Sequence, residues 1–202
     1  MSLTDVPAGQ LAAVVTYLEM RDPPAALDIP ASPLSLHRVA LAPQAYRELF
    51  RAVGAPWLWY SRLLLGDEAL RAIIDHPQVE LFEVRDGDAV VGMLELDRRP
   101  AVSGGEATAC ELSFVGLIPG YAGQGHGRWL LAQGVALGWV SGAERLHVHT
   151  CSLDHPAALA AYRRAGFVAI TRKVETFVDP RLAGILPRDV APQIPLVDRC
   201  AS

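Results

Sequence analysis

Lysine is almost absent from this sequence, since Lys173 is the only lysine among 18 basic residues. With 22 acidic residues the net charge is −4, so no excess of positive charge would attract nucleic acid. Cysteine is also scarce, and Cys110, Cys151 and Cys200 lie far apart. This spacing argues against a disulfide framework and against a CxxC zinc or redox site.

Long apolar runs are missing as well. The apolar stretch at residues 11–18 ends at Glu19 and Arg21 and is too short to span a bilayer. The first ten residues contain Asp5 and no basic run, which does not fit a secretory signal. We therefore expect a cytoplasmic protein with no membrane partner. A length of 202 residues, 51% hydrophobic and 20% charged, predicts one globular domain over 1–202.

Hydrophobic periodicity and turn residues predict the order of the elements. Strands are expected at 11–18, 34–40, 79–85, 89–96, 110–118 and 146–151, and one or two more at 167–178. Helices are expected at 43–53, 57–65, 69–75, 129–140 and 155–165, with loops at 21–33 and 98–108. The turn Asp86-Gly87-Asp88 favours an antiparallel hairpin, and the later strand–helix–strand unit favours a parallel pair. The fold class is therefore α/β (α+β), with a mixed, mostly antiparallel central sheet flanked by helices.

The segment at 119–128, PGYAGQGHGR, lies between a predicted strand and a predicted helix. Glycines at alternate positions permit a tight turn, and the start of a helix presents unpaired N–H groups with a partial positive charge. Such a turn is suited to binding phosphate. The spacing does not match a Rossmann GxGxxG motif, and Gly127-Arg128-Trp129 lacks the Gly-Lys-Ser/Thr of a Walker A loop.

Two segments together resemble the GNAT acetyltransferase superfamily. Residues 117–131, LIPGYAGQGHGRWLL, are similar to its acetyl-CoA signature, V-x-P-x-Y-R-G-x-G-I-G-x-x-L-L. Residues 154–167, DHPAALAAYRRAGF, are similar to its second signature, an Asn followed by a helix that ends Y-x-x-x-G-F. The resemblance implies the GNAT acyl-CoA N-acyltransferase fold. Its core would span 34–180, between an N-terminal strand with a proline-rich loop (1–33) and an irregular tail (181–202).

The resemblance also implies a function, namely transfer of the acetyl group of acetyl-CoA directly to the primary amine of a small molecule or peptide. It implies that the glycine turn holds the cofactor's pyrophosphate through backbone N–H groups and that a strand edge runs along the pantetheine arm. The cofactor-binding residues carried over are Phe114, Leu117, Ala122, Gly123, Gln124, Gly125, His126, Gly127, Arg128 and Asp154.

Two positions depart from the family pattern. Ala122 stands where Arg or Gln is usual, which removes one side-chain contact to the pyrophosphate, although Arg128 could replace it. Asp154 stands where Asn is usual and lacks an amide donor. These departures keep an alternative open, a GNAT-like acyl-CoA-binding module that is catalytically weak or inactive.

Proton transfer requires further residues, because an alkyl amine with a pKa of about 10.4 is almost entirely protonated at neutral pH. Glu111 and Glu95, on neighbouring predicted strands, are alternative candidates for the base, and either could instead be an outward-facing strand residue. Tyr162 matches the family tyrosine that protonates the departing thiolate, and packing in the core is its alternative role.

Histidines and aromatic residues offer further hypotheses. His147 and His149 share one face of a predicted strand and could ligate zinc, but without a second ligand cluster a structural or substrate-facing role is favoured and no metal is expected. The aromatic group Trp57, Trp59 and Tyr60 could line an acceptor pocket, although core packing is the favoured role.

The N-terminal strand has no assigned role in the sequence. It could complete the acceptor pocket, or it could pair with a second copy to form a homodimer.

Overall fold

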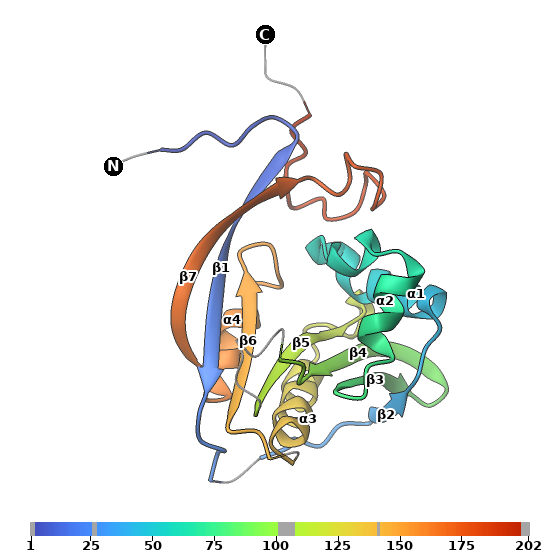
Figure 1. Cartoon of the computed structure of the whole chain (residues 1–202), viewed down its shortest axis with the longest axis vertical. Helices are drawn as coiled ribbons and strands as arrows, with labels where there is room; N and C mark the ends of the chain where they lie inside the picture. Colours follow the sequence, from blue (N-terminus) through green and yellow to red (C-terminus); the bar gives the residue numbers. More distant parts are fainter. Residues whose placement is uncertain (1–2, 26–27, 101–107, 141, 199–202) are drawn as a thin grey trace.

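The computed structural model describes residues 3–25, 28–100, 108–140 and 142–198 (Figure 1). The strands are β1 (Gln10–Met20), β2 (Ser35–Val39), β3 (Val79–Asp86), β4 (Ala89–Asp97), β5 (Ala109–Leu117), β6 (Arg145–Cys151) and β7 (Val168–Val178). The helices are α1 (Pro43–Gly54), α2 (Asp67–Ile74), α3 (His126–Val140) and α4 (Ala158–Arg164). Short 3-10 helices are η1 (Ala55–Trp57), η2 (Ser61–Leu64) and η3 (Pro119–Tyr121).

The strands form a seven-stranded sheet in the order β2-β3-β4-β5-β6-β1-β7. Every neighbouring pair is antiparallel except β5 and β6, which run parallel. The structure therefore confirms the predicted mixed, mostly antiparallel sheet flanked by helices. Among the residues described, no helix combines the length and apolar character that a bilayer crossing requires.

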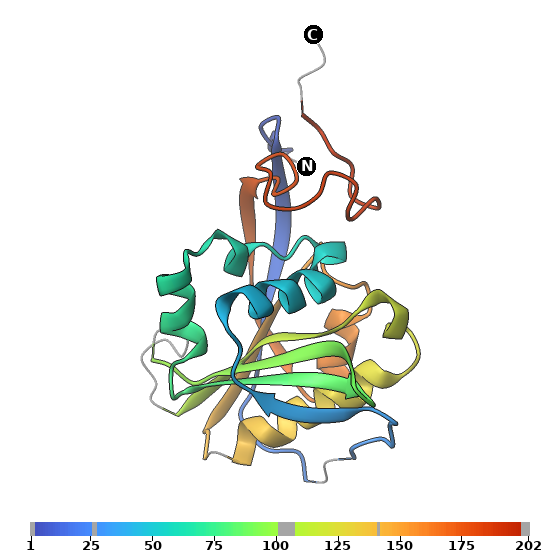
Figure 2. The ribbon, with the colours of Figure 1, turned by 90° about the vertical axis from the view of Figure 1, so that its right-hand side faces the viewer.

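Helices cover both faces of the sheet (Figure 2). On one face, Tyr46 and Phe50 of α1 and Leu70 of α2 pack with Leu81 and Met93 of the sheet. On the other face, α3 packs against the sheet through buried residues that include Trp129, Leu130, Leu131 and Val135. The two hydrophobic layers hold the central strands β3, β4 and β5 between them.

The helix predicted at 57–65 is wrong, because the chain forms η1 and η2 there instead. Leu58, between them, has a left-handed backbone with φ of 55°, which a helix does not permit. Its side chain is buried against Leu186 and Ala191 of the C-terminal tail. Long-range packing therefore overrides the local helical pattern.

Other boundaries differ by smaller amounts. Helix α3 begins at His126 rather than at Trp129, helix α4 begins at Ala158 rather than at His155, and residues 168–178 form one strand. The loop predicted at 98–108 lies largely outside the described residues.

The predicted N-terminal strand is confirmed as β1, and it lies inside the sheet between β6 and β7. Val15, for example, is paired with Cys151 on one side and with Lys173 on the other. Residues 15–20 of β1 pair with β6 and residues 10–19 pair with β7, so residues 10–14 have a side without a strand among the described residues. β1 lies outside the core expected at 34–180, although it belongs to the same sheet, next to the edge strand β7.

A bulge at Ser113 changes which face of the sheet β5 presents. Leu112 is opposite Leu96, whereas Phe114 is opposite the adjacent residue Glu95, so Ser113 is the extra residue. Leu112 packs in the α3 layer, while the ring of Phe114 lies 4.8 Å from that of Phe50 in the α1 layer. The bulge thus turns the second half of β5 toward the α1 side.

The parallel pair β5 and β6 separates after a short stretch. The strands are paired only at Ala109–Arg145, Cys110–Leu146 and Glu111–His147, although both strands continue beyond these residues. The rest of β5 keeps its pairing with β4 and has no strand on its other edge.

The C-terminal tail contains no helix or strand in residues 179–198, yet a buried arginine fixes its path. Arg181 forms an ion pair with Asp179, and both side chains are 2% exposed. The same guanidinium donates hydrogen bonds to the carbonyl oxygens of Val190, Ala191 and Ile194. The Arg181 side chain therefore provides hydrogen-bond donors for backbone carbonyl oxygens that belong to no helix or strand.

We predict that Arg181→Ala lowers the free energy of unfolding by about 3–5 kcal/mol, because it leaves the Asp179 carboxylate buried and unpaired. Urea denaturation measures this loss. The matched control is Arg188→Ala, which removes the exposed pair with Asp198 and should cost less than about 1 kcal/mol. Equal losses in the two variants would contradict this role for Arg181.

Candidate active site

A cavity of about 1150 Å³ lies where β5 and β6 separate. Its wall is formed by the glycine turn before α3, the second half of β5, the end of β6, helix α4, the segment from Trp57 to Ser61, and β7. Most of the residues singled out in the sequence therefore surround one continuous space.

The glycine turn presents free backbone donors to this cavity. Gly123 and Gly125 have φ of 77° and 88°, a left-handed conformation that favours glycine. The amides of residues 123–127 donate no hydrogen bond to any other described residue, and α3 begins at His126. A Cβ built at Gly123, Gly125 or Gly127 would meet no protein atom within 4 Å, so the space in front of these amides is open. This arrangement is suited to an anion such as phosphate.

Side chains add little to this anion site. Ala122 lines the cavity without a polar group, and Gln124 donates from Nε2 to the carbonyl oxygen of Gly120. His126 lies 3.4 Å from the Ser32 hydroxyl through its Nδ1. Arg128 lines the cavity, but Nη2 is paired at 2.7 Å with Asp28, and both side chains are largely exposed. Binding at this turn must therefore depend mainly on the backbone.

Phe114 and Leu117 on β5 also line the cavity. The ring of Phe114 lies 5.1 Å from that of Trp59 and 5.2 Å from the Arg62 guanidinium. Because β5 has no strand partner on this side beyond Glu111, its peptide groups are available to an extended ligand.

Asp154 accepts hydrogen bonds from three donors at the end of β6. Oδ2 accepts from the Thr150 hydroxyl at 2.7 Å and from the Cys151 amide at 2.8 Å, and Oδ1 accepts from Trp59 Nε1 at 3.1 Å. Since all three partners donate, an Asn here would direct its NH₂ group at one of them. Asp154 therefore suits this site better than Asn would, because its second oxygen accepts the hydrogen bond from the Trp59 indole.

Tyr162 lines the cavity from α4, and its ring packs edge-on against Phe167 at 6.0 Å. Its hydroxyl forms no hydrogen bond with another described residue. Burial, with a smaller contribution from the charge of Asp154, raises the pKa of Tyr162 above its ordinary value. The hydroxyl therefore keeps its proton at neutral pH and can donate it into the cavity.

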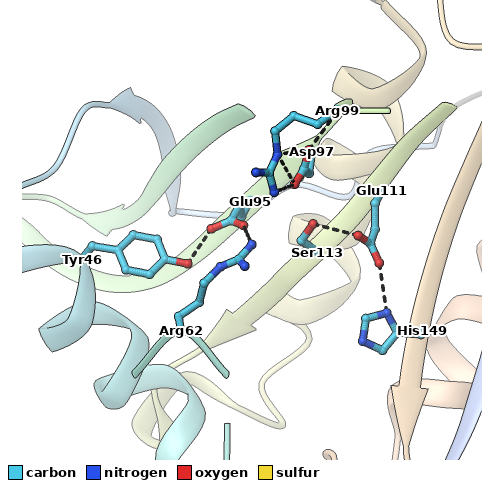
Figure 3. Close-up of polar contacts among 8 residues, drawn as sticks. All are labelled: Tyr46, Arg62, Glu95, Asp97, Arg99, Glu111, Ser113 and His149. Carbon is cyan, nitrogen blue, oxygen red and sulfur yellow. Dashed lines mark hydrogen bonds and ion pairs between the residues drawn. The ribbon is translucent and has the colours of Figure 1, made fainter. Parts of the chain in front are cut away.

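Glu95 is fully buried and does not line the cavity. The Tyr46 hydroxyl donates to Oε2 at 2.5 Å and Arg62 Nη2 to Oε1 at 2.6 Å (Figure 3). Both carboxylate oxygens are thus engaged by α1 and η2. Of the two candidate bases, Glu95 therefore has the geometry of a structural anchor.

Glu111 is connected to the cavity through His149. Its Oε1 lies 3.0 Å from His149 Nδ1, and the Ser113 hydroxyl donates to Oε2 at 3.3 Å (Figure 3). His149 and Ser113 line the cavity, whereas Glu111 lies behind them. The hydrogen bond that Nδ1 donates to Glu111 raises the pKa of His149, against the opposing effect of burial. Nε2 of His149 has no hydrogen-bond partner among the described residues, so it is free to act on a ligand.

The sequence patterns did not predict the hydrogen-bonded pair of His149 and Glu111, because each residue was considered separately. The parallel pairing of Glu111 with His147 brings the two together, and that register follows only from the assembled sheet. No group of three or more His, Cys, Asp or Glu side chains that could hold a metal ion occurs in the described ranges.

The aromatic group Trp57, Trp59 and Tyr60 lines the cavity. The ring of Trp57 lies 5.0 Å from that of His155, and Tyr60 stacks on Phe177 of β7 at 4.9 Å. The sequence left packing and pocket lining open as alternatives for these three residues. In the structure they do both.

Comparison with known proteins gives the family and the fold of this chain. The model of the acetyltransferase (GNAT) family matches residues 42–167. The chain belongs to the GNAT acetyltransferase family. No significant match is found among curated proteins.

Solved structures share the fold at low sequence identity. A GNAT-family protein from Novosphingobium aromaticivorans DSM 12444 has a TM-score of 0.56 and 18% identity, over 87% of this chain and 69% of that one. A GCN5-related N-acetyltransferase from Sphaerobacter thermophilus has the same TM-score, 0.56, and 18% identity, over 85% of this chain and 52% of that one. The chain thus spans about half the length of this second structure.

A third structure is an aminoglycoside acetyltransferase from an uncultured soil metagenomic sample, in complex with sisomicin. It has a TM-score of 0.52 and 17% identity, over 66% of this chain and 87% of that one. At 17–18% identity, the similarity to these solved structures shows the fold of this chain and nothing further about its substrate.

We predict that Glu95→Gln lowers the free energy of unfolding by about 3 kcal/mol, because Arg62 loses its buried counter-charge. Chemical denaturation measures the loss, with the exposed Glu48→Gln on α1 as control. The double variant Arg62→Met, Glu95→Gln should regain part of this stability, since no unpaired charge remains. Unchanged stability combined with lost turnover would instead identify Glu95 as a base.

Proposed function

We propose that this protein transfers the acetyl group of acetyl-CoA to a primary amine by direct transfer. The observation that carries the proposal is that one cavity joins the free amides of the glycine turn to the His149–Glu111 pair and to the Tyr162 hydroxyl. An anion site, a base and a proton donor are the groups that such a transfer requires.

The residues present fit acetyl-CoA, which would supply an activated thioester at this site. The open space before Gly123, Gly125 and Gly127 would accommodate the pyrophosphate, held by the backbone amides and by the positive end of α3. The unpaired edge of β5 from Phe114 to Leu117 would bind the amides of the pantetheine arm as an added strand does.

His149 is proposed as the general base. Its Nε2 would take a proton from the acceptor ammonium, while Glu111 holds Nδ1 and stabilises the protonated ring. Glu111 is thus a positioning residue that acts through His149. Of the two carboxylates considered in the sequence, Glu111 has a route to the substrate.

Tyr162 is proposed as the proton donor to the departing sulfur. Its raised pKa keeps the hydroxyl protonated, and a free hydroxyl in the cavity wall is placed to donate. Direct transfer is supported by Cys151, the cysteine that lines the cavity. Burial raises the pKa of its thiol to about 11, so it is not a thiolate nucleophile at neutral pH.

The second candidate function is an acyl-CoA-binding module without turnover, and Ala122 is the observation that favours it. An assay of coenzyme A release from acetyl-CoA over a panel of primary amines tests the two, together with a calorimetric titration of acetyl-CoA. Release with at least one amine supports transfer. Tight binding of acetyl-CoA with no release from any amine would establish the module instead.

We predict that Gly125→Val weakens coenzyme A binding at least about tenfold, because a branched side chain at φ of 88° strains the turn and enters the open space before the amides. Isothermal titration calorimetry with coenzyme A measures this. Gly120→Ala is the matched control, since Gly120 has no positive φ and its Cβ would meet nothing within 4 Å. Wild-type affinity in Gly125→Val would place the pyrophosphate elsewhere.

We predict that Glu111→Gln shifts the acidic limb of the pH–rate profile to lower pH and lowers kcat. His149 accepts a proton only when neutral, so the rate rises as the pH passes its pKa. The hydrogen bond that His149 donates to the Glu111 carboxylate raises that pKa, and its loss lowers it. Profiles of kcat/KM against pH test this, with the exposed Glu48→Gln on α1 as control because it makes the same change outside the cavity. An unmoved limb would exclude His149 as the titrating base.

A further inference from the structure

Aromatic rings from segments far apart in the sequence line one part of the cavity. Tyr60, which follows η1, and Phe177 of β7 stack with centroids 4.9 Å apart and an interplanar angle of 21°. Trp57 and His155 continue this wall, with centroids 5.0 Å apart. All four side chains line the cavity. This aromatic part of the wall is therefore suited to binding an apolar, planar group.

The C-terminal tail holds this wall in place. Leu58, one residue after Trp57, is buried against Leu186 and Ala191. Gln193 Nε2 donates to the carbonyl oxygen of Pro56 at 2.7 Å. The wall is thus fixed before a ligand arrives, which reduces the entropy cost of binding.

Glu175 adds a negative charge beside the rings. It lines the cavity from β7, and no ion pair joins it to another described residue. Burial, the charge of Glu175 and a hydrogen bond from the phenol to that carboxylate raise the pKa of Tyr60, so the two side chains lie close together. The nearby cation Lys173 does not form an ion pair with Glu175. Its Nζ lies instead 5.1 Å from the ring of Tyr17.

The other acidic residues of the cavity wall are already engaged. Asp154 accepts three hydrogen bonds, and Asp28 is paired with Arg128 at the glycine turn. Among the described residues of the wall, Glu175 accepts from the Tyr60 phenol but has no cationic partner, so it is the carboxylate with capacity for a cationic ligand. A polycation such as an aminoglycoside would leave its further ammonium groups without a counter-charge.

We propose that the acceptor is a monocationic amine with an aromatic body, of the arylalkylamine class. Its ammonium group pairs with Glu175 and its ring packs against Tyr60 and Phe177. This inference rests on the proposed function and adds the substrate class to it. Beside the larger effect of Glu111, the charge of Glu175 also raises the pKa of His149, so the two side chains lie near each other. One proton of the ammonium passes to Nε2, the neutral amine attacks the acyl carbon, and the coenzyme A thiolate leaves and takes a proton from Tyr162.

Binding to the coenzyme A-saturated protein tests the ligand class without requiring turnover. Titration calorimetry compares 2-phenylethylamine, its uncharged analogue 2-phenylethanol, and kanamycin. We expect 2-phenylethylamine to bind most tightly and Glu175→Gln to weaken it about tenfold, leaving 2-phenylethanol unchanged. Phe177→Ala should weaken both phenyl compounds. The exposed Glu68→Gln on α2 changes the net charge equally and should alter neither.

Steady-state kinetics separates this inference from the proposed function. Glu175→Gln should raise KM for 2-phenylethylamine about tenfold, with KM for acetyl-CoA unchanged. Tighter binding of kanamycin, or no effect of Glu175→Gln on 2-phenylethylamine, overturns the arylalkylamine assignment even where other amines release coenzyme A. Glu175-dependent binding without coenzyme A release supports the ligand class and refutes transfer.

Discussion

The separation of β5 from β6 is the constraint on which the site depends. Two parallel strands that pair at three positions and then diverge leave peptide groups without partners along both inner edges. Such edges are stable when they face water or a ligand, and here they border a cavity of about 1150 Å³. The bulge at Ser113 lies at this point and directs Phe114 toward α1 while Leu112 stays on the α3 side. One irregularity in one strand thus gives the cavity an apolar wall and leaves a strand edge free.

The strands and the glycine turn can be predicted from the sequence, because each depends on residues that are close together in the chain. Alternating apolar residues predict the strands, and the glycines at 123, 125 and 127 predict a turn whose positive φ angles at Gly123 and Gly125 the structure shows. The contacts that complete the site join residues far apart in the chain. Glu111 and His149 are separated by 38 positions, and Trp59 and Asp154 by 95. No periodicity within a segment contains that information, and it becomes available only with the register of the sheet.

Asp154 shows how a departure from a family pattern can be compensated elsewhere. Viewed alone, it removes an amide donor from the turn after β6. In the structure its oxygens meet the Trp59 indole, the Thr150 hydroxyl and the Cys151 amide, each of which needs an acceptor. The substitution therefore favours an ordered turn in this chain, and it ties the end of β6 to the aromatic segment across the cavity. Ala122 has no such compensation, which leaves the glycine turn dependent on backbone donors.

The wall that we propose for the acceptor combines residues inside the family match with residues beyond it, since the match ends at residue 167. Glu175 and Phe177 belong to β7, and the tail that packs on Leu58 follows it. Strand β1, which holds β7 in the sheet, precedes the matched region. The buried Glu95–Arg62 pair fixes η2 against β4 within that region, so the aromatic segment is supported from both sides. The family match therefore covers the glycine turn, whereas the proposed choice of acceptor also depends on β1, β7 and the tail, which lie outside the matched residues.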